Sequence, residues 1–147
     1  MPHDFKAFPE LTKTQMQFYY LQSPHKQINE DFDCRVVKVH DGDTIRVNWK
    51  ERDFDFPIRF SNIAAPELNE EGGRESQAWL ENKILNEEVT ILVDPNNKVE
   101  KWGRLLGRVI HRGIDVGEEQ IFTGLVTSWN ARNEGKLIDP VKKKHGT

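Results

Sequence analysis

The sequence has few of the features that stabilise or direct proteins outside the cell. Its 147 residues include one cysteine, Cys34, so no disulfide can form within the chain. No hydrophobic run reaches the length of a signal-peptide core or of a membrane span. These absences exclude a disulfide-stapled scaffold and a helical membrane protein. They lead us to expect a cytoplasmic or otherwise intracellular location and no membrane partner.

An excess of positive charge is also missing. The chain carries 21 Lys and Arg against 24 Asp and Glu, a formal net charge of −3. No global field attracts nucleic acid, so contact with a polyanion must come from a local patch. The five histidines show no metal-ligand spacing. Hydrophobic residues make up 36% of the chain, which suffices for one globular domain of this length.

Three segments differ in their sequence pattern. Residues 1–30 form an N-terminal helical extension, with a helix expected at 11–22, and we expect the extension to pack on the domain because it is rich in aromatic residues. Residues 31–128 are the predicted domain. Residues 129–147 form a polar, basic tail that contains Lys142–Lys144.

Alternation of apolar and polar residues predicts five strands, and longer apolar stripes predict two helices. The strands are expected at 35–40, 44–50, 54–60, 88–93 and 104–111, and the helices at 70–86 and 116–125. In the last helix, Ile121, Phe122 and Leu125 are expected to face inward. Three strands, a helix, two strands and a helix is the order of a small OB-type barrel. We therefore predict a mainly β fold, a five-stranded OB-fold barrel with two to three helices.

Three short stretches contain the candidate chemistry: the turn Asp41–Thr44, the segment 59–67 (RFSNIAAPE) and the segment 101–104 (KWGR). Hydrolysis of a phosphodiester needs an activated water, stabilisation of charge on the phosphate oxygens, and positioning. Glu67 can accept a proton from water. The planar guanidinium groups of Arg59 and Arg104 match phosphate oxygens.

Each of these residues also has an ordinary structural interpretation. Asp43 in a tight turn can simply cap its own backbone, and Glu67 suits the start of a helix. The two arginines can pair with nearby acidic residues, namely Asp53, Asp55 or Glu100. The joint occurrence of these residue types favours the functional interpretation.

The motifs DGDT at 41–44, R-x4-AAPE at 59–67, WGR at 102–104 and GIDV at 113–116 together resemble the staphylococcal nuclease (thermonuclease) family. The resemblance covers about residues 34 to 126. It implies an OB-fold nuclease that uses Ca²⁺ to hydrolyse phosphodiester bonds of DNA and RNA. By the same resemblance, we expect single-stranded substrates to be favoured and the protein to be a monomer.

The resemblance also implies a role for each matching position. It implies Asp43 and the backbone carbonyl of Ala65 as Ca²⁺ ligands. It implies that Arg59 and Arg104 bind the scissile phosphate and that Glu67 is the general base. The remaining positions, Lys101 and Trp102, are expected to contact the substrate, although the family has tyrosine where Trp102 stands.

Ala64 departs from the family pattern, because it occupies the position of the second calcium-binding aspartate. Changes in groups that only support a metal ligand lower affinity or activity about 10–100-fold, and loss of a ligand itself should do at least as much. The implied activity is therefore reduced or abolished. Three alternatives follow: a naturally weakened nuclease, a nuclease inactivated by replacement of the aspartate, or a catalytically silent OB-fold module that binds nucleic acid or protein.

Overall fold

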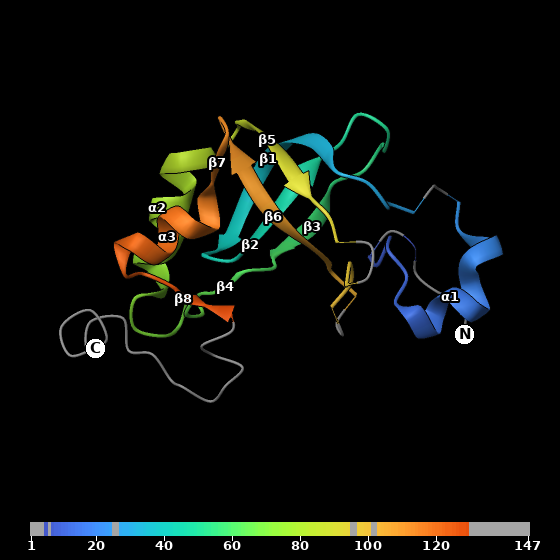
Figure 1. The fold of residues 1–147 in the computed structure, drawn as a ribbon, viewed down its shortest axis with the longest axis horizontal. Helices are drawn as coiled ribbons and strands as arrows, with labels where there is room; N and C mark the ends of the chain where they lie inside the picture. Colours follow the sequence, from blue (N-terminus) through green and yellow to red (C-terminus); the bar gives the residue numbers. More distant parts are fainter. Residues whose placement is uncertain (1–4, 6, 25–26, 95–96, 101–102, 130–147) are drawn as a thin grey trace.

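The computed structural model describes residues 5, 7–24, 27–94, 97–100 and 103–129 (Figure 1). Its helices are α1 (Lys13–Tyr19), a 3₁₀ helix (Tyr20–Gln22), α2 (Gly73–Ile84) and α3 (Val116–Thr123). The strands are β1 (Phe32–Asp41), β2 (Thr44–Asn48), β3 (Phe56–Phe60), β4 (Ile63–Ala64), β5 (Glu88–Leu92), β6 (Leu105–His111), β7 (Ile114–Asp115) and β8 (Thr127–Ser128). None of the helices in these ranges is both long and apolar enough to cross a membrane.

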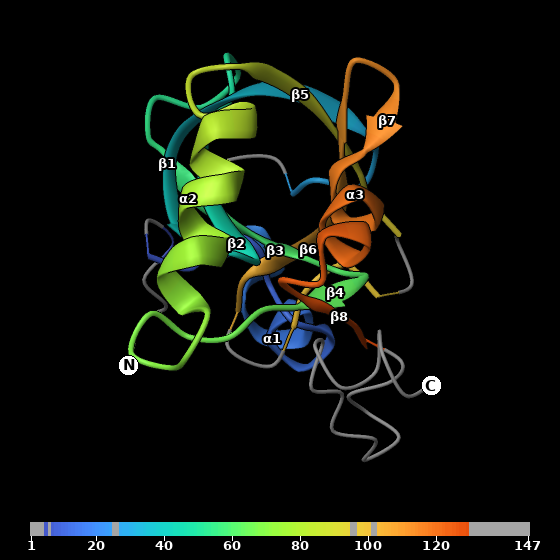
Figure 2. The same ribbon diagram turned by 90° about the vertical axis from the view of Figure 1, so that its left-hand side faces the viewer.

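Five of the strands close into a barrel. The main sheet has the order β3-β2-β1-β5-β6-β7, and a parallel pairing of β3 with β6 closes it. The other pairings in the barrel are antiparallel. Figures 1 and 2 show α2 and α3 beside one another at one end of the barrel and α1 toward the other end. The prediction of a mainly β, OB-type barrel with two to three helices is thus confirmed over the described residues.

The barrel interior follows from the alternation in the sequence. Successive side chains of a strand point to opposite faces, so every second residue enters the core. Ile45 and Val47 of β2 and Phe56, Ile58 and Phe60 of β3 are at most 1% exposed. Burial of such side chains contributes about 1.5–3 kcal/mol each, which makes this interior the main source of stability.

Gly107 lies in β6, where the sequence suggests a bulge or sharp bend. A Cβ at this position would lie 2.5 Å from Cγ2 of Ile91 in the neighbouring strand β5. The glycine therefore allows the close approach of the two strands that a small barrel needs.

The helices are shorter than predicted, and the predicted inward face of α3 is wrong at Phe122. Helix α2 begins after Gly72, which adopts a left-handed φ of 84°, and α3 ends at Gly124, with φ 80°. Phe122 was expected to face inward but is 84% exposed. The reason is that α3 packs through Val116 and Gln120, one turn apart, which places Phe122 on the opposite side of the helix.

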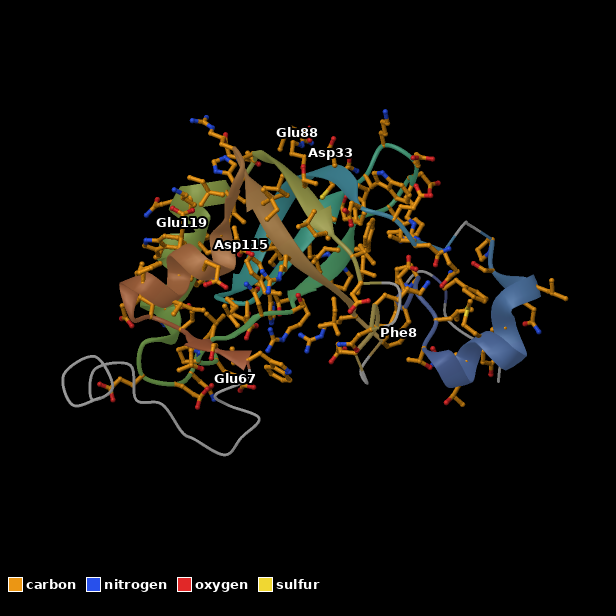
Figure 3. All side chains as sticks on the ribbon, in the orientation of Figure 1. Phe8, Asp33, Glu67, Glu88, Asp115 and Glu119 are labelled. Carbon is orange, nitrogen blue, oxygen red and sulfur yellow. The ribbon has the colours of Figure 1, made fainter. Side chains whose placement is uncertain are left out.

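The N-terminal segment contacts the barrel through a buried ion pair between Glu10 and Arg52. Both side chains are 1% exposed, and the Arg52 guanidinium lies 4.6 Å from the ring centroid of Phe56. The Glu10 carboxylate also accepts a hydrogen bond from the backbone N–H of Ile28 at 2.9 Å. Phe8, labelled in Figure 3, lies against Gly103, where an added Cβ would be 2.9 Å from its ring.

We expect Arg52→Met to destabilise the protein by about 3–5 kcal/mol, because the variant leaves the Glu10 carboxylate buried without its cation. The double variant Glu10→Leu/Arg52→Met should recover a large part of this loss, since neither charge then remains buried. Urea unfolding followed by circular dichroism measures both. Equal stability of Arg52→Met and the parent would show that the pair does not hold the N-terminal segment.

We also expect Cys34 to resist alkylation in the folded protein. The side chain is 3% exposed, and burial together with the charges of Glu88 and Asp33 raises the pKa of its thiol to about 12. The reactive thiolate is therefore scarce at pH 8. Iodoacetamide labelling read by mass spectrometry should be slow without denaturant and rapid in 6 M guanidinium, about the concentration that unfolds stable domains. Rapid labelling of the native protein would contradict this arrangement of β1.

Candidate active site

An acidic turn connects β1 with β2. The Asp41 carboxylate accepts a hydrogen bond from the backbone N–H of Asp43 at 3.1 Å, as Asx turns do. Burial of the Asp41 carboxyl, together with its interaction with the Asp43 side chain, raises the pKa of Asp41 from 3.8 to about 7. The Asp41 carboxyl therefore resists ionisation below about neutral pH.

Asp43 connects this turn with two other segments. One carboxylate oxygen accepts a hydrogen bond from the Thr44 hydroxyl at 3.1 Å, and the other accepts one from the backbone N–H of Ala65 at 2.9 Å. The second oxygen also lies 3.3 Å from Nη2 of Arg59. Asp43 is 8% exposed, so its charge is compensated mainly by these protein groups.

Besides Asp43, three groups of the described residues contact the Arg59 side chain. Its Nη1 donates to the carbonyls of Phe60 at 2.6 Å and Ile63 at 2.9 Å. Its guanidinium carbon lies 5.1 Å from the ring centroid of Trp129. Burial lowers the pKa of Arg59 below its ordinary value, although an arginine stays charged in proteins. The register of β2 and β3, which pairs Thr44 with Arg59, places this side chain beside the acidic turn.

Arg104 approaches the same turn from the loop before β6. Its Nη1 donates to the Thr44 hydroxyl at 3.2 Å. The Glu100 carboxylate accepts from the backbone N–H of Arg104 at 2.9 Å and from its Nε at 3.2 Å. The pairing with Glu100 that we considered as a structural role therefore exists, and it also orients the guanidinium toward Thr44. The positive charge of Arg104 contributes to the lowered pKa of Arg59, so the two cations lie near one another.

Glu67, the predicted general base, lies at the surface. Glu67 is exposed, and its backbone N–H donates to the Glu70 carboxylate at 2.7 Å. Across the described ranges, no ion pair or hydrogen bond joins its carboxylate to Asp43, Arg59 or Arg104. Figure 3 shows Glu67 on the side of the molecule where β8 lies, away from Glu88 and Asp33.

Two other predicted residues, Lys101 and Trp102, lie outside the described residues. Their expected contacts with the substrate stay predictions.

Ala64, the position of the missing aspartate, is 4% exposed and lies in β4, which pairs with β8. Its carbonyl accepts a hydrogen bond from the Thr127 hydroxyl at 3.4 Å. The next residue, Ala65, donates its amide to Asp43. A carboxylate introduced at position 64 would therefore belong to the residue next to Ala65, whose amide donates to Asp43.

Asp41, Asp43 and Thr44 of the turn carry side-chain oxygens that could bind a metal ion, and hard cations such as Ca²⁺ prefer oxygen ligands. Within the described residues, however, no three His, Cys, Asp or Glu side chains are grouped so that they could hold a metal ion. Asp41 and Asp43 supply two carboxylates, and Ala64 supplies none. The donor chemistry thus suits calcium, while the number of carboxylates is low.

Sequence reasoning named Glu100 as a possible partner of the arginines, and the structure pairs it with Arg104. It did not identify the other neighbours that orient these side chains. The contact of Trp129 with Arg59 had no local signal, because the pairing of β8 with β4 creates it.

Comparisons with known proteins give one family model and several relatives. Residues 57–142 match the family model described as Staphylococcal nuclease homologue. Two proteins named uncharacterized endonuclease, from Escherichia coli O157:H7 and Escherichia coli, are each 31% identical over 112 residues. That match covers 76% of this chain and 67% of each relative. A Bacillus anthracis protein named only as uncharacterized is 31% identical over 91 residues, 57% of this chain and 41% of that protein.

We expect Asp41→Asn to stabilise the calcium-free protein at pH 8 and to change little near pH 4. The folded-state pKa of Asp41 lies above its ordinary value, so the folded state loses stability as the pH rises from about 4 to about 7. Asparagine removes this ionisation and keeps an oxygen for the Asp43 amide.

Urea unfolding in chelator at both pH values measures the difference between parent and variant. Asp53→Asn, in the exposed turn after β2, makes the same change in charge and should give no comparable gain. A stabilisation by Asp41→Asn that is equal at pH 4 and pH 8 would contradict the raised pKa.

Proposed function

This chain belongs to the family of staphylococcal nuclease homologues, and on that basis we propose that it is a calcium-dependent nuclease whose activity is reduced or abolished by alanine at position 64. The proposed reaction is hydrolysis of phosphodiester bonds in DNA or RNA, with single strands favoured. The nuclease names of the relatives support the reaction class.

One observation carries the proposal: two arginines from separate parts of the barrel meet at one acidic turn. Arg59 contacts Asp43, and Arg104 contacts Thr44, the next residue. Each guanidinium has five N–H donors, and their contacts within the described residues, with Asp43, Thr44, Glu100 and two backbone carbonyls, leave donors for further oxygens. A phosphodiester entering this site would find planar donors for its oxygens, and these would stabilise the charge that develops during hydrolysis.

The remaining roles are assigned to Asp43, Ala65 and Glu67. Asp43 and the carbonyl of Ala65 would hold Ca²⁺, with water completing its coordination. When bound, the ion would polarise the phosphate and lower its negative charge. Glu67 would accept the proton of the attacking water. Its exposed position suits this role only in the substrate complex, since catalytic contacts are often loose without substrate.

A binding module is the second candidate. The arginine pair supports it as well, because guanidinium groups bind phosphate without any metal. Under this alternative the chain binds nucleic acid in the presence of a chelator and does not cut it.

We expect Ala64→Asp to cut denatured DNA at least about tenfold faster than the parent in Ca²⁺, because it supplies the carboxylate that the family pattern has at this position. Cleavage by both proteins should stop in chelator. Ala78→Asp, on the exposed face of α2, adds the same charge and should leave the rate unchanged. Gel analysis of end-labelled DNA measures the rates.

Position 64 is buried, so the fold of the aspartate variant is checked by its melting temperature with and without Ca²⁺. A bound ion should raise it. If the folded variant and the parent both bind DNA but neither cuts, the protein is a binding module and the catalytic roles given to Glu67 and the arginines are wrong.

A further inference from the structure

Gln120 of α3 has a polar side chain that is buried and contacts the acidic turn. Gln120 is 1% exposed, and its Nε2 donates to the carbonyl of Gly42 at 2.6 Å. The two residues are 78 positions apart in the sequence. This hydrogen bond is therefore a direct link between α3 and the residue between Asp41 and Asp43.

The turn is also confined from the side of α2. A Cβ on Gly42 would lie 1.7 Å from Oγ of Ser76 and 2.8 Å from Cβ of Ala65. Ser76 is itself 1% exposed. Gly42 thus fits between α2 and the segment after β4, while Gln120 holds its carbonyl.

The orientation of that carbonyl matters for Asp43. The peptide unit between Gly42 and Asp43 is planar, so fixing the carbonyl oxygen also fixes the amide and the Cα of Asp43. From that position the Asp43 carboxylate reaches the backbone N–H of Ala65 and the guanidinium of Arg59. The amide of Asp43 meanwhile donates to Asp41.

Packing alone does not account for a glutamine at position 120. Its Oε1 is buried and accepts no hydrogen bond from the described residues. A buried amide with one unsatisfied atom is destabilising relative to an apolar side chain of the same shape. The hydrogen bond to Gly42 is the one contribution of this side chain that an apolar residue could not make.

We propose that Gln120 is a positioning residue, which holds the Asp41–Thr44 turn in the geometry required to bind a divalent cation beside Arg59. It touches neither the ion nor the substrate and acts through the Gly42 carbonyl. The inference rests on the proposed function for its consequence, while the hydrogen bond itself can be tested without any activity.

The test compares Gln120→Met with Gln27→Met. Methionine keeps the length of the side chain and removes the donor. Gln27 is also buried, at 4% exposed, and its Nε2 donates to the Pro9 carbonyl at 2.8 Å, in the N-terminal segment. Both variants lose a buried amide-to-carbonyl hydrogen bond, but only one of these bonds reaches the turn.

The first readout is amide hydrogen exchange of the calcium-free proteins, followed by NMR. Loss of a hydrogen bond of ordinary net strength should speed exchange at Asp43 and Ala65 about two- to tenfold in Gln120→Met. Relative to amides in the barrel strands, the same two positions should be unchanged in Gln27→Met. Unchanged exchange at Asp43 and Ala65 in Gln120→Met overturns the inference.

The second readout is calcium affinity, measured by calorimetry in proteins that also carry Ala64→Asp. Gln120→Met should weaken binding about two- to tenfold, and Gln27→Met should not. Faster exchange with unchanged affinity would mean that the hydrogen bond only stabilises the fold, which also overturns the inference. If the Ala64→Asp protein neither binds Ca²⁺ nor cuts DNA, the proposed function fails, and with it the cation-binding role of Gln120, whatever the exchange shows.

Discussion

The buried carboxylate of Asp43 is the interaction on which the site depends. It accepts the backbone N–H of Ala65 and lies 3.3 Å from the Arg59 guanidinium, so it joins the turn after β1 to the segments around β3 and β4. A buried charge is tolerated only when it is paired and hydrogen-bonded, and removing one partner leaves the other strongly destabilised. The positions of Asp43, Arg59 and Ala65 are therefore interdependent, and a change at one shifts the others.

The charge of the site explains what alanine at position 64 changes. Even with two arginines nearby, the pKa of Asp41 is raised to about 7 because it is buried beside Asp43. The surroundings of the turn therefore disfavour ionisation of Asp41. A further carboxylate at position 64 would add repulsion that a divalent cation offsets. Under the proposed function, alanine at position 64 would avoid this repulsion but would supply no carboxylate to attract the cation.

Local sequence patterns predicted the barrel, while the roles of the candidate site residues came from the family resemblance and stay predictions. The strand that carries Arg59 and the turn that contains Asp43 were both expected from the sequence and are present. The inward face of α3 was wrong at Phe122, because the helix packs through Val116 and Gln120 instead. Contacts such as that of Gln120 with Gly42 join residues far apart in the chain, and no periodicity reports them. They depend on how helices pack on the closed barrel.

Closure of the barrel is what converts separate motifs into one site. The parallel pairing of β3 with β6 sets Arg59 opposite Leu106. Arg104, which directly precedes β6, therefore lies close enough to donate a hydrogen bond to Thr44. A shift of this register by one residue would exchange the two faces of β3 and send Arg59 into the apolar interior. Burial of Ile58 and Phe60 opposes that shift, because both would become exposed. The same hydrophobic alternation that stabilises the barrel therefore also fixes the distance between the two arginines.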